Sequence, residues 1–261
     1  MNSNIATAFI NCLQAEAGVQ YIILHGCAKC DRYVYVPADK RDTCPHVNED
    51  GQVCGEPRYD AHGEPKERVF YFPLTPKLNA LMKCKKYRIM CQHEFFRDRN
   101  PLLMTDVYDG AKWKMYMGPC TYPVERIGLL GCGDGIPAFD NGQHSLKPWM
   151  FKNLSLPPGV RSKLKYFILW MLLDCSIKAQ GQIKYFEWST SFELKKLHYE
   201  GVDGMKVKFF SINMDTKGRE EASIRNDYVS RLPVVSSVYT CVISTSKWAR
   251  RRWFPIIFAN G

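Results

Sequence analysis

The chain of 261 residues lacks any long hydrophobic run. Its most apolar stretch, Tyr166–Leu173, ends at Asp174 and is far shorter than the roughly 20 apolar residues that a membrane-spanning helix needs. We therefore expect no membrane partner, and we interpret this stretch as a buried strand or a short buried helix. The first residues, Met1–Asn4, are polar and lack the basic and apolar segments of a secretory signal peptide.

The chain also lacks an even number of cysteines, because it contains 11. Together with the polar start, this count argues against a secreted disulfide scaffold and predicts reduced thiols in a nuclear or cytoplasmic compartment. Four of the cysteines form a pattern that is described below. We interpret the other seven as ordinary core or surface thiols: Cys12, Cys84, Cys91, Cys120, Cys132, Cys175 and Cys241.

Acidic residues are in the minority, with 26 Asp and Glu against 36 Lys and Arg, so the net charge is +10 and the pI is about 9.0. This balance favours a polyanionic partner such as nucleic acid over a small-molecule substrate. The alternative is a protein that is basic without binding nucleic acid.

Four cysteines lie in one short stretch, as Cys27-x-x-Cys30 followed by Cys44 and Cys54. The segment between the pairs, Tyr33–Pro37, alternates like a β-strand. Two cysteine pairs around a short strand predict a zinc ribbon with one tetrahedral, structural Zn²⁺ ion. The second pair lacks the usual Cys-x-x-Cys spacing, so His46 is an alternative ligand. We prefer Cys54, with the intervening residues looped out.

Beyond the ribbon, Thr75-Pro76-Lys77 predicts the start of a helix that continues towards Cys91, with threonine as its cap. One face of this helix is basic, and it is either a DNA contact or a solvated surface. Its candidate DNA-binding residues are Lys83, Lys85, Lys86 and Arg88.

From Ile127 onwards the sequence predicts three strands, a helix and a fourth strand. The expected elements are strands at 127–133, 146–154 and 167–173, a helix at 191–199 and a strand at 205–214. A ribonuclease-H-like fold places one carboxylate on its first strand and another at the end of its fourth. Asp134 and Asp215 occupy these positions, and carboxylates suit two Mg²⁺ ions that cleave a phosphodiester.

The alternative for Asp134 is an ordinary Asp-Gly turn. Asp140 and Asp174 are other acidic residues at expected strand ends. Periodicity does not separate them from the chosen pair.

Several segments, taken in order, resemble the transposases of CACTA (En/Spm) DNA transposons. The Asp-Gly motif lies in Gly133–Phe139, and it is followed by His144–Trp149 and by the Asn-Leu-Pro-Pro-like turn Asn153–Pro158. A Glu-Leu-x-x-Leu-x-x-x-Gly-Val-like segment follows at Phe192–Val202. Upstream, the similar segments are Tyr71–Leu78 and Cys54–Tyr59. The resemblance covers about Cys27 to Val202.

The resemblance implies that Asp134 is the first member of an Asp-Asp-Glu/Asp catalytic triad, with DNA transposon ends as the ancestral substrate. The second aspartate matches Asp215, but the sequence after it, Thr216–Arg219, departs from the family's Asp-x-Pro-Ala-like motif. We identify no third acidic residue and no following cysteine-rich segment. We therefore expect a truncated or degenerate copy that retains DNA binding but has lost strand cleavage. We also expect the missing helices to leave the strand at 167–173 under-covered.

The other candidate DNA-binding residues lie near the C-terminal end of the sequence, where they are interleaved with tryptophan. They are Lys247, Arg250, Arg251 and Arg252. This pattern suits phosphate contact with base stacking, a nuclear localisation signal, or a shifted or truncated reading frame. The sequence thus predicts an N-terminal helix (1–22), a zinc ribbon (23–62), a helical or irregular linker with a basic face (63–122) and an incomplete ribonuclease-H-like domain (123–261). The alternative function is a zinc-ribbon module that binds nucleic acid or protein without enzymatic activity.

Overall fold

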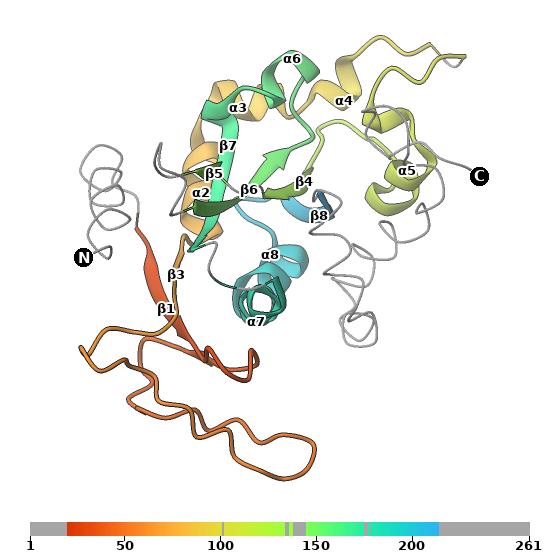
Figure 1. The fold of residues 1–261 in the computed structure, drawn as a ribbon. Coiled ribbons are helices and arrows are strands. Elements are labelled where there is room, and N and C mark those ends of the chain that lie inside the picture. The colour runs from red at the N-terminus through yellow and green to blue at the C-terminus, as the bar shows by residue number, and fades with distance from the viewer. Residues whose placement is uncertain are drawn as a thin grey trace.

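The computed structural model describes residues 20–100, 102–133, 136–137, 145–174, 177 and 179–213 (Figure 1). Several predictions fall outside these residues and stay predictions. They concern residues 1–19 of the predicted N-terminal helix (1–22), whose last residue, Ile22, instead starts a strand. They also concern the aspartates Asp134, Asp140 and Asp215, and the C-terminal cations Lys247, Arg250, Arg251 and Arg252.

One mixed β-sheet forms the centre of the described structure, in the order β2-β1-β3-β7-β6-β4-β8, and β5 pairs with β6. All neighbouring strands are antiparallel except β4 and β8, which are parallel. The strands are β1 (Ile22–Gly26), β2 (Val34–Tyr35), β3 (Arg68–Tyr71), β4 (Arg126–Gly133), β5 (Ile136–Pro137), β6 (Ser145–Asn153), β7 (Phe167–Asp174) and β8 (Lys206–Asn213). With the helices below, this sheet confirms the mixed α and β class.

The four strands expected after residue 126 are confirmed as β4, β6, β7 and β8. The prediction that the third of them is under-covered is wrong. Strand β7 lies between β3 and β6, and its side chains Trp170, Met171 and Leu173 are buried. Strand β3 pairs with β7 along its edge, and Trp170, Met171 and Leu173 belong to the largest hydrophobic cluster, which packs on the sheet.

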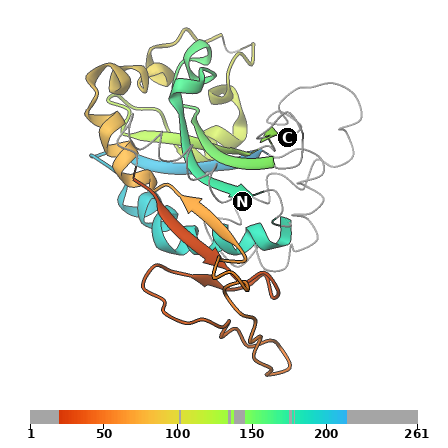
Figure 2. The same ribbon diagram turned by 60° about the vertical axis from the view of Figure 1, so that its left-hand side comes forward.

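The sheet crosses both of the expected boundaries, at 62/63 and 122/123. Strand β1 comes from the predicted ribbon, β3 from the predicted linker and β7 from the predicted third unit, yet β1 pairs with β3 and β3 pairs with β7. Sequence composition at these positions changes because loops and helices intervene, while the hydrogen-bonded sheet continues. The segment between β1 and β3, which carries the cysteines, projects from the body (Figures 1 and 2).

The helix expected from Thr75 towards Cys91 is broken into two. Helix α2 spans Leu74–Lys83 and α3 spans Lys85–Met90, and Cys84 between them has extended backbone angles. Helix α2 starts one residue before Thr75, and the residue at its N-cap position is Pro73, which offers no side-chain acceptor. The expected threonine cap is therefore wrong.

A distant carboxylate satisfies the start of α2 instead. The side chain of Glu193 accepts hydrogen bonds from the amides of Leu74 (2.9 Å) and Thr75 (2.8 Å), and from the hydroxyls of Thr75 (2.6 Å) and Tyr71. Glu193 is buried. A negative charge at a helix N-terminus is stabilising, so this contact joins two segments that are 118 to 122 residues apart in sequence.

Glu193 belongs to a π-helical turn, Thr190–Leu194, inside a long helical segment. Helix α7 (Ala179–Ser189) precedes this turn and α8 (Lys195–Glu200) follows it, so the helix expected at 191–199 starts earlier than the sequence indicates. In Figure 1, α7 and α8 lie on the side of the sheet opposite to α3 and α6. The π-turn gives Glu193 its position facing α2.

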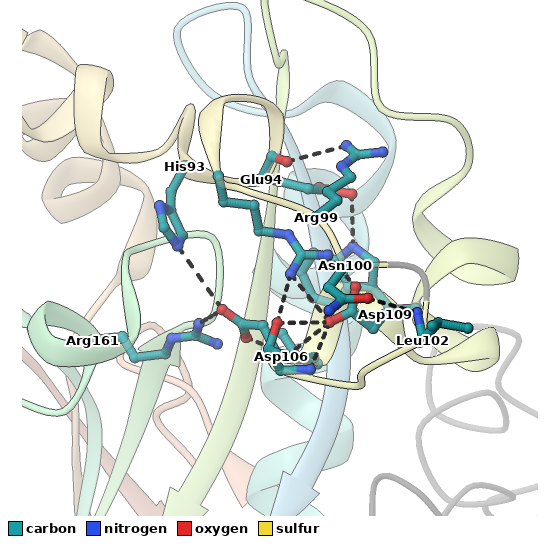
Figure 3. A network of polar contacts seen from close by, with 12 residues as sticks. His93, Glu94, Arg99, Asn100, Leu102, Asp106, Asp109 and Arg161 are labelled. Atoms are coloured by element: carbon teal, nitrogen blue, oxygen red, sulfur yellow. Dashed lines mark hydrogen bonds and ion pairs between the residues drawn. The ribbon is translucent and has the colours of Figure 1, made fainter.

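The shorter helices gather around the start of β4. They are α4 (His93–Phe96), the 3₁₀ turn η1 (Val107–Asp109), α5 (Ala111–Met117), α6 (Pro158–Arg161) and the 3₁₀ turn η2 (Leu164–Tyr166). Figure 3 shows the polar network that joins α4, η1 and α6. Asp106 pairs with Arg161, and Asp109 pairs with Arg97. Each of these carboxylates is neutralised by an arginine, so the network has a structural role.

Candidate metal centre

The four predicted cysteine ligands converge in space. The sulfurs of Cys27, Cys30, Cys44 and Cys54 all lie within 4.8 Å of one another, and they form the single group of three or more such ligand residues in the described part of the chain. The Cys27 and Cys54 sulfurs are 3.7 Å apart, and those of Cys30 and Cys44 are 3.6 Å apart. The cluster is therefore able to hold one metal ion.

The sulfur separations discriminate between two chemistries. A tetrahedral site with Zn–S bonds of about 2.3 Å places its sulfurs about 3.8 Å apart. A disulfide requires about 2.05 Å. The observed separations match the tetrahedral geometry, and these four cysteines are free thiols. They are compatible with zinc, although separation alone does not identify the metal.

Local backbone geometry explains the first ligand pair. The chain leaves β1 at Gly26 and turns tightly, so that the Cys30 amide donates to the Cys27 sulfur (3.5 Å). Asp31 directly after the pair has φ = 53°, a left-handed conformation that aspartate tolerates better than most residues. The turn then returns into β2.

The second pair sits at the base of a β-hairpin. The Cys44 amide donates to the Glu56 carbonyl (2.9 Å), and the Cys54 amide donates to the His46 carbonyl (2.7 Å). Val47 and Val53 pair across the hairpin beyond the cysteines. The hairpin brings Cys54 to the cluster and leaves His46 out of it, so the choice of Cys54 with a looped-out insertion agrees with the geometry.

Burial and backbone amides act in opposite directions on these thiols. Burial raises the pKa of Cys27 and of Cys44. Burial also acts to raise the pKa of Cys54, but the Glu56 amide and the neighbouring thiols outweigh it, so that pKa is lowered. A metal ion binds thiolates and releases their protons, so it relieves the cost of burying these four groups together.

The cysteine segment is not basic. Between Cys27 and Lys66 there are six Lys and Arg against eight Asp and Glu. Arg58 is buried, and it donates to His25 (2.9 Å) and to the Asp39 carbonyl (2.8 Å). The segment therefore offers little positive charge for phosphate, although the whole chain is strongly basic.

The expected carboxylate site lies at the ends of two neighbouring strands. Strands β4 and β8 pair in parallel, and the last matched residues are Cys132 and Asn213. Asp134 follows β4 directly after Gly133, and Asp215 follows β8 by two residues. The strands that lead to these residues thus end side by side, while the aspartates themselves are outside the described residues.

The cysteine cluster extends from the same edge of the sheet. Through successive antiparallel pairs, His25 in β1 is matched with Arg68 in β3, and Val69 is matched with Leu173 in β7. Strand β7 runs in the same direction as β4, because both are antiparallel to β6. The end of β1, where Cys27 begins, therefore lies at the edge where β4 and β8 end.

The expected basic patch lies at the opposite edge. Lys83, Lys85 and Lys86 are exposed and have no ion-pair partner among the residues that the structure describes. Arg88 instead pairs with Asp203 (3.2 Å), just before the start of β8. The neighbouring Tyr87 accepts a hydrogen bond from Asn153 at the end of β6 (2.9 Å). Strand β4, with 8 residues, spans roughly 26 Å at about 3.3 Å per residue. This length separates the basic patch from the edge of the sheet where β4 and β8 end.

Sequence reasoning missed the residues that surround the metal centre. Lys184 in α7 and Glu67 before β3 form a buried ion pair (2.6 Å), and the Tyr185 hydroxyl donates to Glu67 (2.7 Å). Tyr185 lies 118 positions from Glu67, and Lys184 lies 157 positions from Cys27. No periodicity signals such a contact, because it depends on the tertiary fold.

No helix in the described parts of the chain is long and apolar enough to cross a membrane. Comparisons of the chain with protein-family models, with curated proteins and with solved structures found no match.

Proposed function

We propose that this chain is a transposase-derived, zinc-stabilised DNA-binding protein whose catalytic carboxylate site is incomplete. The observation that carries the proposal is the parallel pairing of β4 with β8 inside the order β7-β6-β4-β8. Three strands, a helix and a fourth strand, in this order, are what the sequence predicts for a ribonuclease-H-like domain. This arrangement meets the first geometric requirement of a carboxylate pair on adjacent strands.

The parallel pairing matters because two-metal chemistry needs carboxylates close together. Adjacent strands are about 4.8 Å apart, which suits carboxylates that share metal ions about 4 Å apart. Asp134 and Asp215 would hold Mg²⁺ there, and Mg²⁺ would stabilise the attacking and leaving oxygens of a phosphodiester. Without a third acidic ligand, affinity and geometry both suffer. We therefore propose that DNA binding persists and that strand cleavage is lost.

The cysteine cluster supports a structural zinc ion. Four thiolates in tetrahedral geometry leave no open position for a substrate. The excess of acidic residues between Cys27 and Lys66 argues against direct phosphate contact by this segment. In the proposed function zinc folds the segment, the exposed lysines bind DNA, and the protein acts in the nucleus.

The proposed DNA contact rests on three cations that have no ion-pair partner within the described parts of the chain. Lys83, Lys85 and Lys86 are exposed around the junction of α2 and α3. Charge reversal of all three to glutamate should weaken duplex affinity at least tenfold at low salt. It should also flatten the dependence of log K on log salt by about three, since each lysine neutralises about one phosphate. The matched control is charge reversal of Lys29, Lys40 and Lys66 in the acidic cysteine segment.

The deciding experiment measures DNA binding and DNA cleavage separately. Fluorescence anisotropy with duplex DNA over a salt series tests binding, and a nicking and strand-transfer assay with Mg²⁺ or Mn²⁺ tests chemistry. The proposal expects binding without cleavage. Cleavage that Asp134→Ala abolishes would overturn the claim of an incomplete site. Absence of DNA binding at low salt would overturn the function itself.

One observation favours a second function, a zinc module that binds another protein. The tip of the cysteine hairpin exposes Val47 and Val53 (51% and 63%) within an acidic segment. Exposed apolar residues with charged surroundings suit a protein contact. Absence of DNA binding by the wild-type chain at low salt would favour this function.

A further inference from the structure

A buried lysine lies directly behind the candidate metal centre. The side chain of Lys184 in α7 is 1% exposed, and its ammonium group donates to the backbone carbonyl of Cys27 (2.8 Å). The same group contacts Glu67 Oε1 (2.6 Å) and lies 3.9 Å from Asp31. One cation therefore touches the first ligand residue and approaches the residue that ends the ligand turn.

The contacts around Lys184 leave little room for movement. The Tyr185 hydroxyl donates to Glu67 Oε1 (2.7 Å), and the Gly26 amide donates to the Glu67 carbonyl (3.1 Å). A side chain at Gly26 would overlap Tyr185, Glu67 and Lys184. The backbone of β1 thus comes as close to α7 as glycine allows, immediately before Cys27.

Electrostatics gives this cation a role at the metal centre. A divalent ion bound by four thiolates carries a net charge of −2, and a nearby buried cation stabilises such a charge because the interior screens it weakly. A buried ammonium group is in turn costly unless it is paired. Glu67 balances part of the lysine charge, and the metal–thiolate centre would balance more of it.

We propose that Lys184 is a positioning residue of the metal centre, and that it couples metal binding at Cys27, Cys30, Cys44 and Cys54 to the docking of α7 on the sheet. The inference rests on the proposed binding of a metal ion by these cysteines. Metal binding would gather the ligands and fix the Cys27 carbonyl and the Asp31 turn, so it would hold Lys184 in place. By thermodynamic linkage, docking of α7 raises metal affinity to the same degree.

Coupling of this kind reaches the predicted catalytic edge. Helix α7 belongs to the connection from β7 to β8, and β8 is the strand that leads to Asp215. Loosening of α7 after metal loss would therefore disturb the pairing of β8 with β4. The metal centre, which contributes no residue to the predicted carboxylate pair, would still control its geometry.

The test compares zinc affinity in matched variants by competition with a chromophoric chelator. Lys184→Met removes the cation while keeping an unbranched side chain, and it should weaken zinc binding by about 10- to 100-fold, as outer-sphere substitutions at metal sites do. Lys184→Arg keeps the charge and should recover part of the affinity. The control is Lys77→Met, because Lys77 is a partly buried lysine in α2 whose ammonium group donates to the Leu169 carbonyl (3.3 Å).

The outcomes separate this inference from the proposed metal binding. If the wild-type chain binds no zinc, the metal centre itself is refuted. If the wild type binds zinc and Lys184→Met binds it equally well, only the coupling is refuted. Equal weakening by Lys77→Met would also refute it, because a general loss of stability would then explain the effect.

Hydrogen exchange of the wild-type chain tests the coupling without any substitution. Removal of zinc with a chelator should speed amide exchange in α7 more than in α2. Helix α7 carries Lys184, which contacts the Cys27 carbonyl, whereas Lys184 is not part of α2. Equal changes in both helices, or no change in α7, would overturn the proposal.

Discussion

Replacement of Glu193 by glutamine tests whether the two family-like segments are held together as the structure indicates. One oxygen of Glu193 accepts from the Thr75 amide and hydroxyl, and the other accepts from the Tyr71 hydroxyl and the Leu74 amide. Glutamine keeps one acceptor oxygen and turns the other into a donor. Whichever oxygen is lost, one backbone amide at the start of α2 and one hydroxyl lose their acceptor.

The size of the effect follows from these contacts. A buried donor left without an acceptor costs about 1–3 kcal/mol, and two donors are affected. The hydroxyl can rotate to accept from the new amide group, which reduces the loss. We expect Glu193→Gln to lower the free energy of unfolding by about 3 kcal/mol. Glu193→Ala, which removes every acceptor, should lower it by about 4 kcal/mol, a large share of the roughly 5–15 kcal/mol of an ordinary domain.

Urea unfolding followed by circular dichroism, at a fixed zinc concentration, measures this loss. The matched control is Glu200→Gln in α8, since Glu200 is 66% exposed and lies 3.9 Å from Lys196. Exposed pairs of this kind contribute less than about 1 kcal/mol. If Glu193→Gln is no more destabilising than Glu200→Gln, the capping of α2 by Glu193 is wrong.

Three further predictions concern other parts of the molecule. Elemental analysis after dialysis should find one zinc ion per chain, which Cys54→Ala removes and His46→Ala retains; the reverse pattern would identify histidine as the ligand. Gly26→Ala should cost about 2 kcal/mol in urea unfolding through steric overlap with Tyr185, and an unchanged midpoint would contradict the close packing. The Arg97 guanidinium holds the pKa of Asp109 well below its usual value. This carboxylate therefore stabilises the fold at pH values above its unfolded pKa of about 3.9. The stabilisation is lost as the pH falls through the lowered pKa of the folded state. Asp109→Asn should therefore destabilise by about 2 kcal/mol at pH 7 and by less at pH 2 to 3, whereas a constant difference would contradict the linkage.

The strands and the metal ligands were predictable because their signals are local. Alternation and apolar runs gave β4, β6, β7 and β8 within one or two residues. Cysteine spacing identified all four sulfurs, and the preference for Cys54 over His46 agrees with the hairpin. These features depend on residues that lie close together in the sequence, so the local sequence pattern predicts them.

The helix boundaries and the organisation of the sheet were not predictable in the same way. The cap of α2 comes from Glu193, more than 100 residues away, so the local choice of Thr75 was reasonable and wrong. The break between α2 and α3 at Cys84 was not predictable, because no proline or glycine lies at that position. The pairing of β1 with β3 and of β3 with β7 depends on tertiary contacts, which explains why composition placed boundaries where the sheet is continuous.

The Glu193 contact gives a physical reason for part of the family resemblance. Tyr71–Leu78 and Phe192–Val202 were noted as separate similar segments, and the structure joins them through one carboxylate. Glu193 is buried and accepts four hydrogen bonds, two on each carboxylate oxygen. Neither oxygen is therefore free to bind a metal ion near the ends of β4 and β8. Packing of α2 against the helical segment that contains Glu193 therefore gives both sequence segments a structural role in this chain. This contact serves folding whether or not the chain retains catalysis, because it stabilises the start of α2 and ties it to the helical segment that contains Glu193.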